Sequence, residues 1–221
     1  MARLAKLAKL DLYKKHHAEY VTPKEPVFVV VGPAQYLSIT GHGAPGGRLF
    51  QDHVAALYSV AFTLKMAEKF SGHDYRVCHL EGQWWAEDCS GFGSDEEADS
   101  RSHEARDFRS HQAEDWQWRL LIRVPTFVHQ KQLDAAIRAI LAKGKTTLAG
   151  QVKLETLTEG RCVQMLHVGP YAAEKQDVER MQATAESQGL HLRGPHHEIY
   201  LSDPRRVPAE RLRTILRYPV E

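Results

Sequence analysis

One pattern of segments occurs twice along the chain, and it restricts the possible folds more than any other feature of the sequence. Each half contains an extended segment, a turn with glycine, an amphipathic helix and two more extended segments. The halves span about residues 27–125 and about residues 150–221. Few side chains are identical between them, so the order of elements carries the argument. Two such units can form one antiparallel sheet with helices on one face and an open opposite face. The sequence therefore predicts an α+β fold of tandem duplicated β-α-β-β units within a single domain, residues 1–221.

Three helices are predicted from apolar residues that recur at helical spacing. The first covers about residues 48–70 and places these apolar side chains on one face: Phe50, Val54, Leu57, Ala61 and Leu64. The second lies around residues 133–141 and is closed by Gly144. The third covers about residues 174–188, and Gly189 ends it.

The remaining segments predict strands and their connections. Strands are expected in these ranges: 27–40, 75–87, 116–125, 152–160, 162–170, 196–203 and 213–220. Gly82 indicates a bulge or bend within its strand. The glycine-rich residues 41–47 lack the Gly-Lys-Ser/Thr ending of a phosphate-binding loop and are interpreted as a strand-to-helix connection. Residues 89–115 are polar and highly charged, which predicts a long hairpin insertion without chemistry of its own.

Composition excludes several classes of function. The 29 Lys and Arg residues nearly balance the 28 Asp and Glu residues, so no net charge favours nucleic acid or membranes as partners. Leu4, Leu7 and Leu10 indicate a short helical stripe and not the core of a signal peptide, and a cytoplasmic location is expected. The three cysteines lack a CxxC spacing, and adjacent histidines chelate poorly on a strand. The sequence therefore predicts no disulfide, no metal and no cofactor.

The strand around residues 196–203 carries the most informative polar residues. Glu198 and Tyr200 alternate with Ile199 and Leu201, which are expected to pack against the helices. Glu198 and Tyr200 would then face the uncovered side of the sheet. A carboxylate at that place is an ordinary solvated residue unless aromatic side chains surround it. If they do, its pKa rises, and it can bind a cation or transfer a proton.

Aromatic residues elsewhere favour the second interpretation of Glu198. The adjacent Trp84 and Trp85 place one indole on each face of a strand, so one is expected to line a ligand site while the other packs. Glu81 is either a second carboxylate of that site or a solvated residue. Tyr171 lies at the turn before the third helix, where it could reach a cleft or pack in the turn. The sequence contains no G-x-S-x-G motif, so a carboxylate and a water molecule would carry any catalysis.

Six segments together resemble the GyrI-like small-molecule-binding proteins, specifically their stand-alone subgroup with Glu-Gly-x-Trp-Trp. They are LDLYKKHHAEY, YSVAFTLK, LEGQWWAED, WQWRLLI, LHVGPY and HHEIYLSDPRR. The resemblance covers nearly the whole chain and implies duplicated, SHS2-like units with a ligand groove at their pseudo-twofold axis. In related transcription regulators, the glutamate that matches Glu198 meets cationic aromatic drugs. The sequence carries no recognisable helix-turn-helix region, so the resemblance implies a ligand pocket without a DNA-binding domain.

Some members of the subgroup are similar to hydrolases of cyclopropane-bearing DNA alkylators of the duocarmycin and yatakemycin type. The resemblance then implies that Trp84 or Trp85, Tyr171 and Tyr200 clasp a flat toxin, while Glu198 positions or deprotonates water. Tyr171 or a histidine would stabilise the developing phenolate. The alternative is a binding protein without turnover, which sequesters an aromatic or cationic small molecule or modulates a partner such as DNA gyrase.

Overall fold

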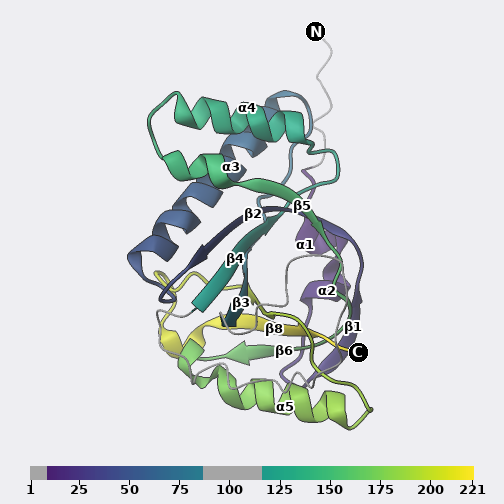
Figure 1. Cartoon of the computed structure of the whole chain (residues 1–221). Helices are drawn as coiled ribbons and strands as arrows, with labels where there is room; N and C mark the ends of the chain where they lie inside the picture. Colours follow the sequence, from purple (N-terminus) through teal and green to yellow (C-terminus); the bar gives the residue numbers. More distant parts are fainter. Residues whose placement is uncertain (1–8, 87–115) are drawn as a thin grey trace, which may run out of the picture.

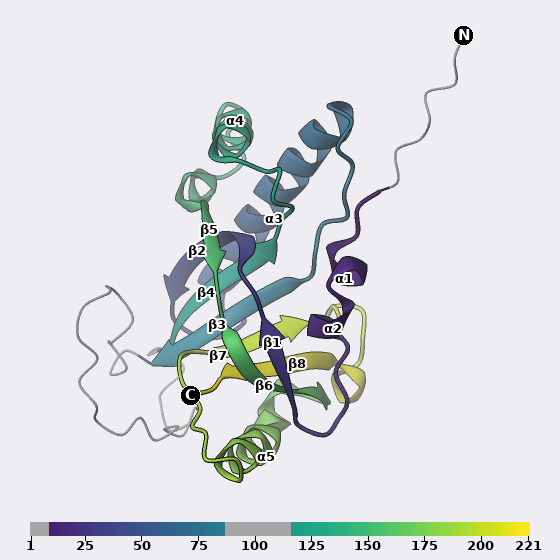
Figure 2. The ribbon, with the colours of Figure 1, turned by 90° about the vertical axis from the view of Figure 1, so that its right-hand side faces the viewer.

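The computed structural model describes residues 9–86 and 116–221. The predicted insertion at 89–115 and most of the leucine stripe at the N-terminus lie outside these residues. The described chain is a mixed α+β structure with one curled, eight-stranded antiparallel sheet (Figures 1 and 2). The predicted fold class is therefore confirmed.

Strands and helices follow one another in the order expected from the sequence. The strands are β1 (Val27–Val31), β2 (Ala34–His42), β3 (Leu80–Ala86), β4 (Trp116–Arg123), β5 (Lys153–Leu157), β6 (Gly160–Val168), β7 (His196–Tyr200) and β8 (Arg213–Pro219). The helices are α1 (Leu12–Lys15), α2 (His17–Tyr20), α3 (Arg48–Phe70), α4 (Gln130–Leu141) and α5 (Glu174–Glu186). The short helices α1 and α2 were not predicted, because four residues are too few to show a helical period.

The strand order of the sheet is palindromic, β1-β6-β8-β7-β3-β4-β2-β5. The first half contributes β2, β3 and β4, and the second contributes β6, β7 and β8 in the mirrored order. The first strand of each half pairs with the opposite half, so that β1 joins β6 and β5 joins β2. The two halves meet where β3 pairs with β7, and we call this pairing the seam.

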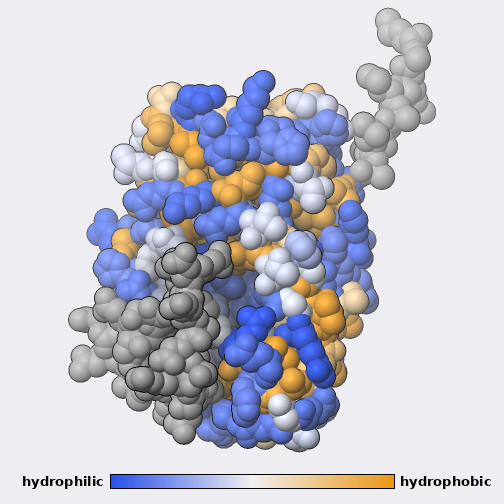
Figure 3. Space-filling model, turned by 45° about the vertical axis from the view of Figure 1, so that its right-hand side comes forward, coloured by the Kyte–Doolittle hydropathy of each residue, from blue (hydrophilic) through white to orange (hydrophobic). Residues whose placement is uncertain are grey.

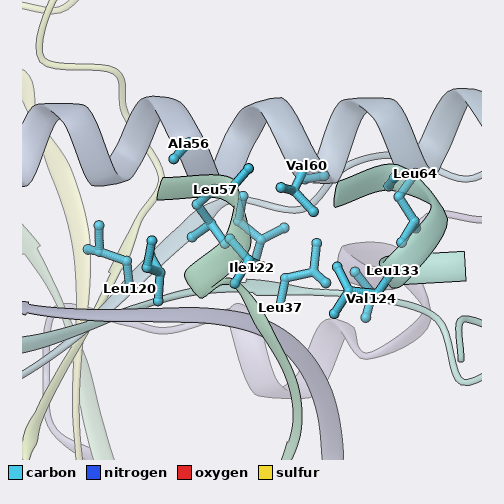
Figure 4. Close-up of a cluster of buried hydrophobic side chains, with 14 of the residues drawn as sticks. Leu37, Ala56, Leu57, Val60, Leu64, Leu120, Ile122, Val124 and Leu133 are labelled. Carbon is cyan, nitrogen blue, oxygen red and sulfur yellow. The ribbon is translucent and has the colours of Figure 1, made fainter. Parts of the chain in front are cut away.

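The helices α3 and α5 cover one face of the sheet, which we call the helix face, and α4 packs against α3. Leu57, Val60 and Leu64 of α3 are fully buried and lie over Leu37 and Ile122 of the sheet (Figure 4). Each such side chain contributes roughly 1.5–3 kcal/mol when it leaves water. The periodic apolar residues predicted for this helix all belong to this core or pack against it.

In the second half, α5 covers the same face of the sheet, and it lies at the opposite end of the molecule from α3 and α4 (Figure 1). Met181 and Ala185 of α5 pack on Val163, Met165 and Leu216 of β6 and β8. The strand that carries Glu198 lies between the two covered regions, because β7 follows β8 in the sheet and precedes β3.

The opposite face of the sheet is not open at the seam, contrary to the prediction. Tyr20 of α2 packs there with Ile199 and Ile215. We call this side the N-terminal face. Ile199 therefore packs against the N-terminal segment and not against α3 or α5. Strand alternation shows which residues share a face but not which face the helices cover, and this is why the prediction failed.

The surface mixes polar and apolar residues, as the view in Figure 3 shows.

Among the described helices, none combines the length and the apolar character needed to cross a membrane. Cys78 and Cys162 are free thiols, and Cys89 lies outside the described residues.

Candidate functional site

The candidate site lies on the helix face of the seam. Gly82 pairs with Glu198 and Trp84 pairs with His196. Residues directly opposite each other in an antiparallel pair project to the same side of the sheet. Trp84, which packs with the core under α3, therefore shares its face with His196 and Glu198. The register places an indole, an imidazole and a carboxylate next to one another between the two halves.

Gly82 makes room for the aromatic rings of the site. A Cβ atom at this position would lie 2.9 Å from both the indole nitrogen of Trp84 and the hydroxyl of Tyr200. Pairing of β3 with β4 and with β7 continues through Gly82 without interruption. The predicted bulge at Gly82 is therefore wrong, and the glycine is explained by the lack of space for a side chain.

Three buried polar side chains meet beside Trp84, and we call them the carboxylate cluster: Glu174, His196 and Glu198. Glu198 is only 6% exposed, and its Oε1 lies 3.2 Å from Nε2 of His196. Glu174, the first residue of α5, is 2% exposed. One donor atom from each residue lies within 4.8 Å of the others. This spacing would allow a cation to bind or a proton to move among the three groups.

Glu174 and His196 were not identified from the sequence as site residues. An acidic residue in the first turn of a helix has an ordinary explanation in the helix dipole, so Glu174 gave no separate signal. His196 is one of two adjacent histidines, a spacing that argues against joint chelation and does not single out His196. Its place on the same face of β7 as Glu198 was the signal available in the sequence.

Tyrosines and Trp84 surround the carboxylate cluster. The indole nitrogen of Trp84 donates a hydrogen bond to the hydroxyl of Tyr200 at 3.1 Å. Tyr171 meets the Tyr200 ring edge-on with centroids 6.0 Å apart, and Tyr218 lies 4.9 Å from the ring of His196. Tyr171 remains 36% exposed, so one aromatic wall of the site can be reached from solvent.

Burial and the two carboxylates keep these phenols protonated. Burial, followed by the charges of Glu198 and Glu174, raises the pKa of Tyr171 to about 12. Burial and Glu198 raise the pKa of Tyr200 well above its ordinary value. Each phenol is therefore neutral at physiological pH and can donate a hydrogen bond.

The structure does not bring Trp85 and Glu81 to the carboxylate cluster. Trp85 pairs with Gln117 and projects to the N-terminal face, so Trp84 is the indole that lies beside Glu198. Glu81 pairs with Ile199 on that same N-terminal face and is 1% exposed. The predicted role of Glu81 in contacting a ligand beside Glu198 is therefore corrected, because one residue of register separates the two faces.

Glu81 instead belongs to a buried set of charges that we call the seam network: Glu81, Glu159, His197 and Arg217. His197 lies between two carboxylates, with Nδ1 2.7 Å from Glu159 and Nε2 3.1 Å from Glu81. Arg217 donates to the other oxygen of Glu159 at 2.9 Å. Burial alone would lower the pKa of His197, but Glu159 and Glu81 raise it to about 9.

Comparison with known proteins identifies the family of this chain. Residues 127–221 match the GyrI-like small molecule binding domain. The structure resembles an uncharacterized conserved protein from Listeria innocua, with 33% identity and a TM-score of 0.82 over 96% of this chain and 100% of the other. A hydrolase from Listeria innocua is similar at 32% identity and a TM-score of 0.80, again over 96% and 100% of the two chains. The chain therefore belongs to the GyrI-like small-molecule-binding family.

A more distant likeness concerns the fold alone. The EcmrR C-terminal domain shares 11% identity with a TM-score of 0.52 over 89% of this chain and 97% of the other. None of the curated proteins compared with this sequence matches it significantly.

Proposed function

We propose that this protein is a hydrolase that binds a flat aromatic small molecule at the helix face of the seam and opens the cyclopropane ring of DNA-alkylating cyclopropanoid toxins. The observation that carries the proposal is the burial of Glu198 beside His196 and Glu174, among Trp84 and tyrosine rings. The hydrolase from Listeria innocua supports the reaction class. The resemblance to the cyclopropanoid hydrolases suggests the substrate.

Glu198 is the proposed base for the attacking water. Water adds to the unsubstituted carbon of the cyclopropane as the strained carbon–carbon bond breaks. The electron pair of that bond moves into the dienone, which becomes an aromatic phenolate. Glu198 accepts the proton from water, and the phenolate oxygen receives one proton in turn, so the product is the toxin plus one water molecule. Because ring strain and aromatisation drive the reaction, positioning of water and substrate supplies much of what the protein must add.

Neighbouring groups hold Glu198 and bind the substrate in this proposal. His196, 3.2 Å from Glu198, orients the carboxylate. Glu174 is the second carboxylate of the cluster, and one of its oxygens lies within 4.8 Å of the ligand atoms of His196 and Glu198. Tyr171 is the proposed donor to the dienone oxygen, because it is a neutral phenol on the exposed side of the site. Trp84 and Tyr200 provide flat surfaces for the aromatic substrate.

Incubation of the purified protein with a duocarmycin-type cyclopropanoid tests this function. Mass spectrometry should detect the water adduct of the toxin. Glu198→Gln should slow its formation by roughly 10²–10⁴-fold, the usual contribution of a general base. Glu179→Gln is the matched control, because Glu179 is an exposed carboxylate on α5. Adduct formation at the wild-type rate by Glu198→Gln would remove Glu198 from the reaction.

A second candidate function is binding without turnover, in which the protein sequesters an aromatic cation. The two carboxylates of the cluster favour this alternative, because negative charges next to aromatic rings suit such ligands. Saturable, stoichiometric binding of the toxin without any water adduct would support it over hydrolysis.

A further inference from the structure

The helix face carries the proposed ligand site, while the N-terminal face of the same two strands carries the seam network. We propose that Glu81 and His197 are positioning residues: their contact on the N-terminal face holds β3 and β7 in the arrangement that aims Trp84 and Glu198 at a ligand. This inference rests on the proposed function only for the identity of the site. Neither residue touches the ligand in this proposal.

The backbone connects the two faces directly. His197 lies between His196 and Glu198 in the sequence, and its side chain projects to the opposite side of β7 from theirs. On β3, Glu81 directly precedes Gly82, and the side chain of Glu81 likewise projects to the N-terminal face. A contact between Glu81 and His197 therefore joins the two strands one residue away from the paired Gly82 and Glu198. Loss of the contact would let the strands shift relative to each other beneath the site.

The seam network is anchored well beyond these two residues. Glu159 holds the other nitrogen of His197, and Arg217 joins Glu159 to Gln164 of β6 with a 2.9 Å hydrogen bond. On the other side, the hydroxyl of Tyr20 donates to Glu81 at 3.3 Å. The network thus connects β3, β7, β8, β6 and the N-terminal segment. These contacts hold His197 from both sides, so the position of His197 determines the position of β7 relative to β3.

The hydrogen bond between Trp84 and Tyr200 provides a readout on the ligand face. It joins β3 to β7 across the site, so its geometry changes if the strands shift. The indole N–H signal of Trp84 in a ¹H–¹⁵N spectrum, assigned with Trp84→Phe, reports this bond without a ligand or turnover. A role of the network in stability alone would not alter the signal of the folded protein.

Four variants test the inference through this signal and through the affinity for tetraphenylphosphonium, an aromatic cation used as a binding probe. Glu81→Ala should move the Trp84 signal and weaken probe binding by about tenfold or more, since misplacement of a site is costly. Glu81→Gln should keep the probe affinity within about threefold of wild type and leave the Trp84 signal near its wild-type position, because it preserves the length of the side chain and a polar oxygen beside Nε2 of His197. Tyr20→Phe removes one donor to Glu81 and should move the signal less. If Glu81→Ala fails to fold, Tyr20→Phe provides the test of the inference in its place.

Glu155→Ala is the matched control. Glu155 is a half-buried carboxylate of β5 that accepts from Ser38 at 2.8 Å and from Arg119 at 3.2 Å, away from β7. This variant should leave the Trp84 signal and the probe affinity unchanged. The inference is overturned if Glu81→Ala and Tyr20→Phe keep the wild-type signal, or if Glu155→Ala moves it equally. If the wild-type protein does not bind the probe, the proposed site is at fault, and the Trp84 signal still decides the positioning role.

Discussion

The two faces of the seam bury similar groups but arrange their charges differently. On the N-terminal face, His197 and Arg217 balance Glu81 and Glu159, and every group is held by a close partner. On the helix face, the carboxylate cluster combines two carboxylates with one histidine, and aromatic rings surround them. In the seam network each charge has a partner of opposite sign, whereas a cluster with more carboxylates than basic groups beside a reachable aromatic wall suits a ligand. Substitutions on either face test this contrast.

Removal of Arg217 should have the largest effect on stability. Arg217→Met leaves Glu159 buried without its arginine, and breaking a buried pair in this way costs about 3–5 kcal/mol. The free energy of unfolding, measured by urea denaturation, should fall by that amount. An unchanged midpoint would show that the network on the N-terminal face is dispensable for the fold.

Insertion of a methyl group at Gly82 should disturb the helix face. Gly82→Ala places a Cβ atom 2.9 Å from the hydroxyl of Tyr200, which requires a shift that costs roughly 1–3 kcal/mol. Thermal unfolding and probe binding should both weaken. Gly150→Ala is the control, because a Cβ atom at Gly150 would meet nothing within 4 Å. Equal behaviour of the two variants would refute the crowding at Gly82.

Stability should depend on pH through His197. The pKa of His197 is about 9 in the folded protein, and its ordinary value of 6.5 applies to the unfolded chain. The contribution of the charged His197 to the free energy of unfolding is therefore complete below pH 6.5. That contribution should decline as the pH rises through about 9. Tyr171, with a pKa of about 12, titrates above this window. Urea denaturation at several pH values should show a loss of about 1–3 kcal/mol, which His197→Gln abolishes. A wild-type profile that stays flat to pH 10 would contradict the assignment.

Loss of a single hydroxyl at Tyr200 should have the smallest effect. Tyr200→Phe removes the acceptor of the Trp84 hydrogen bond but keeps the ring, at a cost of about 0.5–1.5 kcal/mol. Thermal unfolding should register this modest change, and probe affinity should fall by less than in Gly82→Ala. A larger loss of affinity in Tyr200→Phe would indicate that its hydroxyl contacts the ligand.

Strand alternation correctly predicted which residues of β7 and β3 share a face. It separated Glu198 and Tyr200 from Ile199 on β7, and the register confirms that these residues project to opposite sides. It also showed that Trp84 and Trp85 lie on different faces. It could not choose between the two indoles, because the choice depends on how β3 pairs with β7. The assignment of Glu81 failed for the same reason, since a register is a property of two strands.

Local sequence patterns suffice to predict the individual elements and their repeated order, because spacings of 3.6 and 2 residues arise from the geometry of helices and strands. Only the folded chain shows that α2 covers the N-terminal face and that Glu174 lies beside Glu198. Glu174 and Glu198 are far apart in the chain, and only the packing of α5 on the sheet brings these two carboxylates together. The separation of the seam network from the carboxylate cluster therefore follows from strand register and helix packing, which no local pattern encodes.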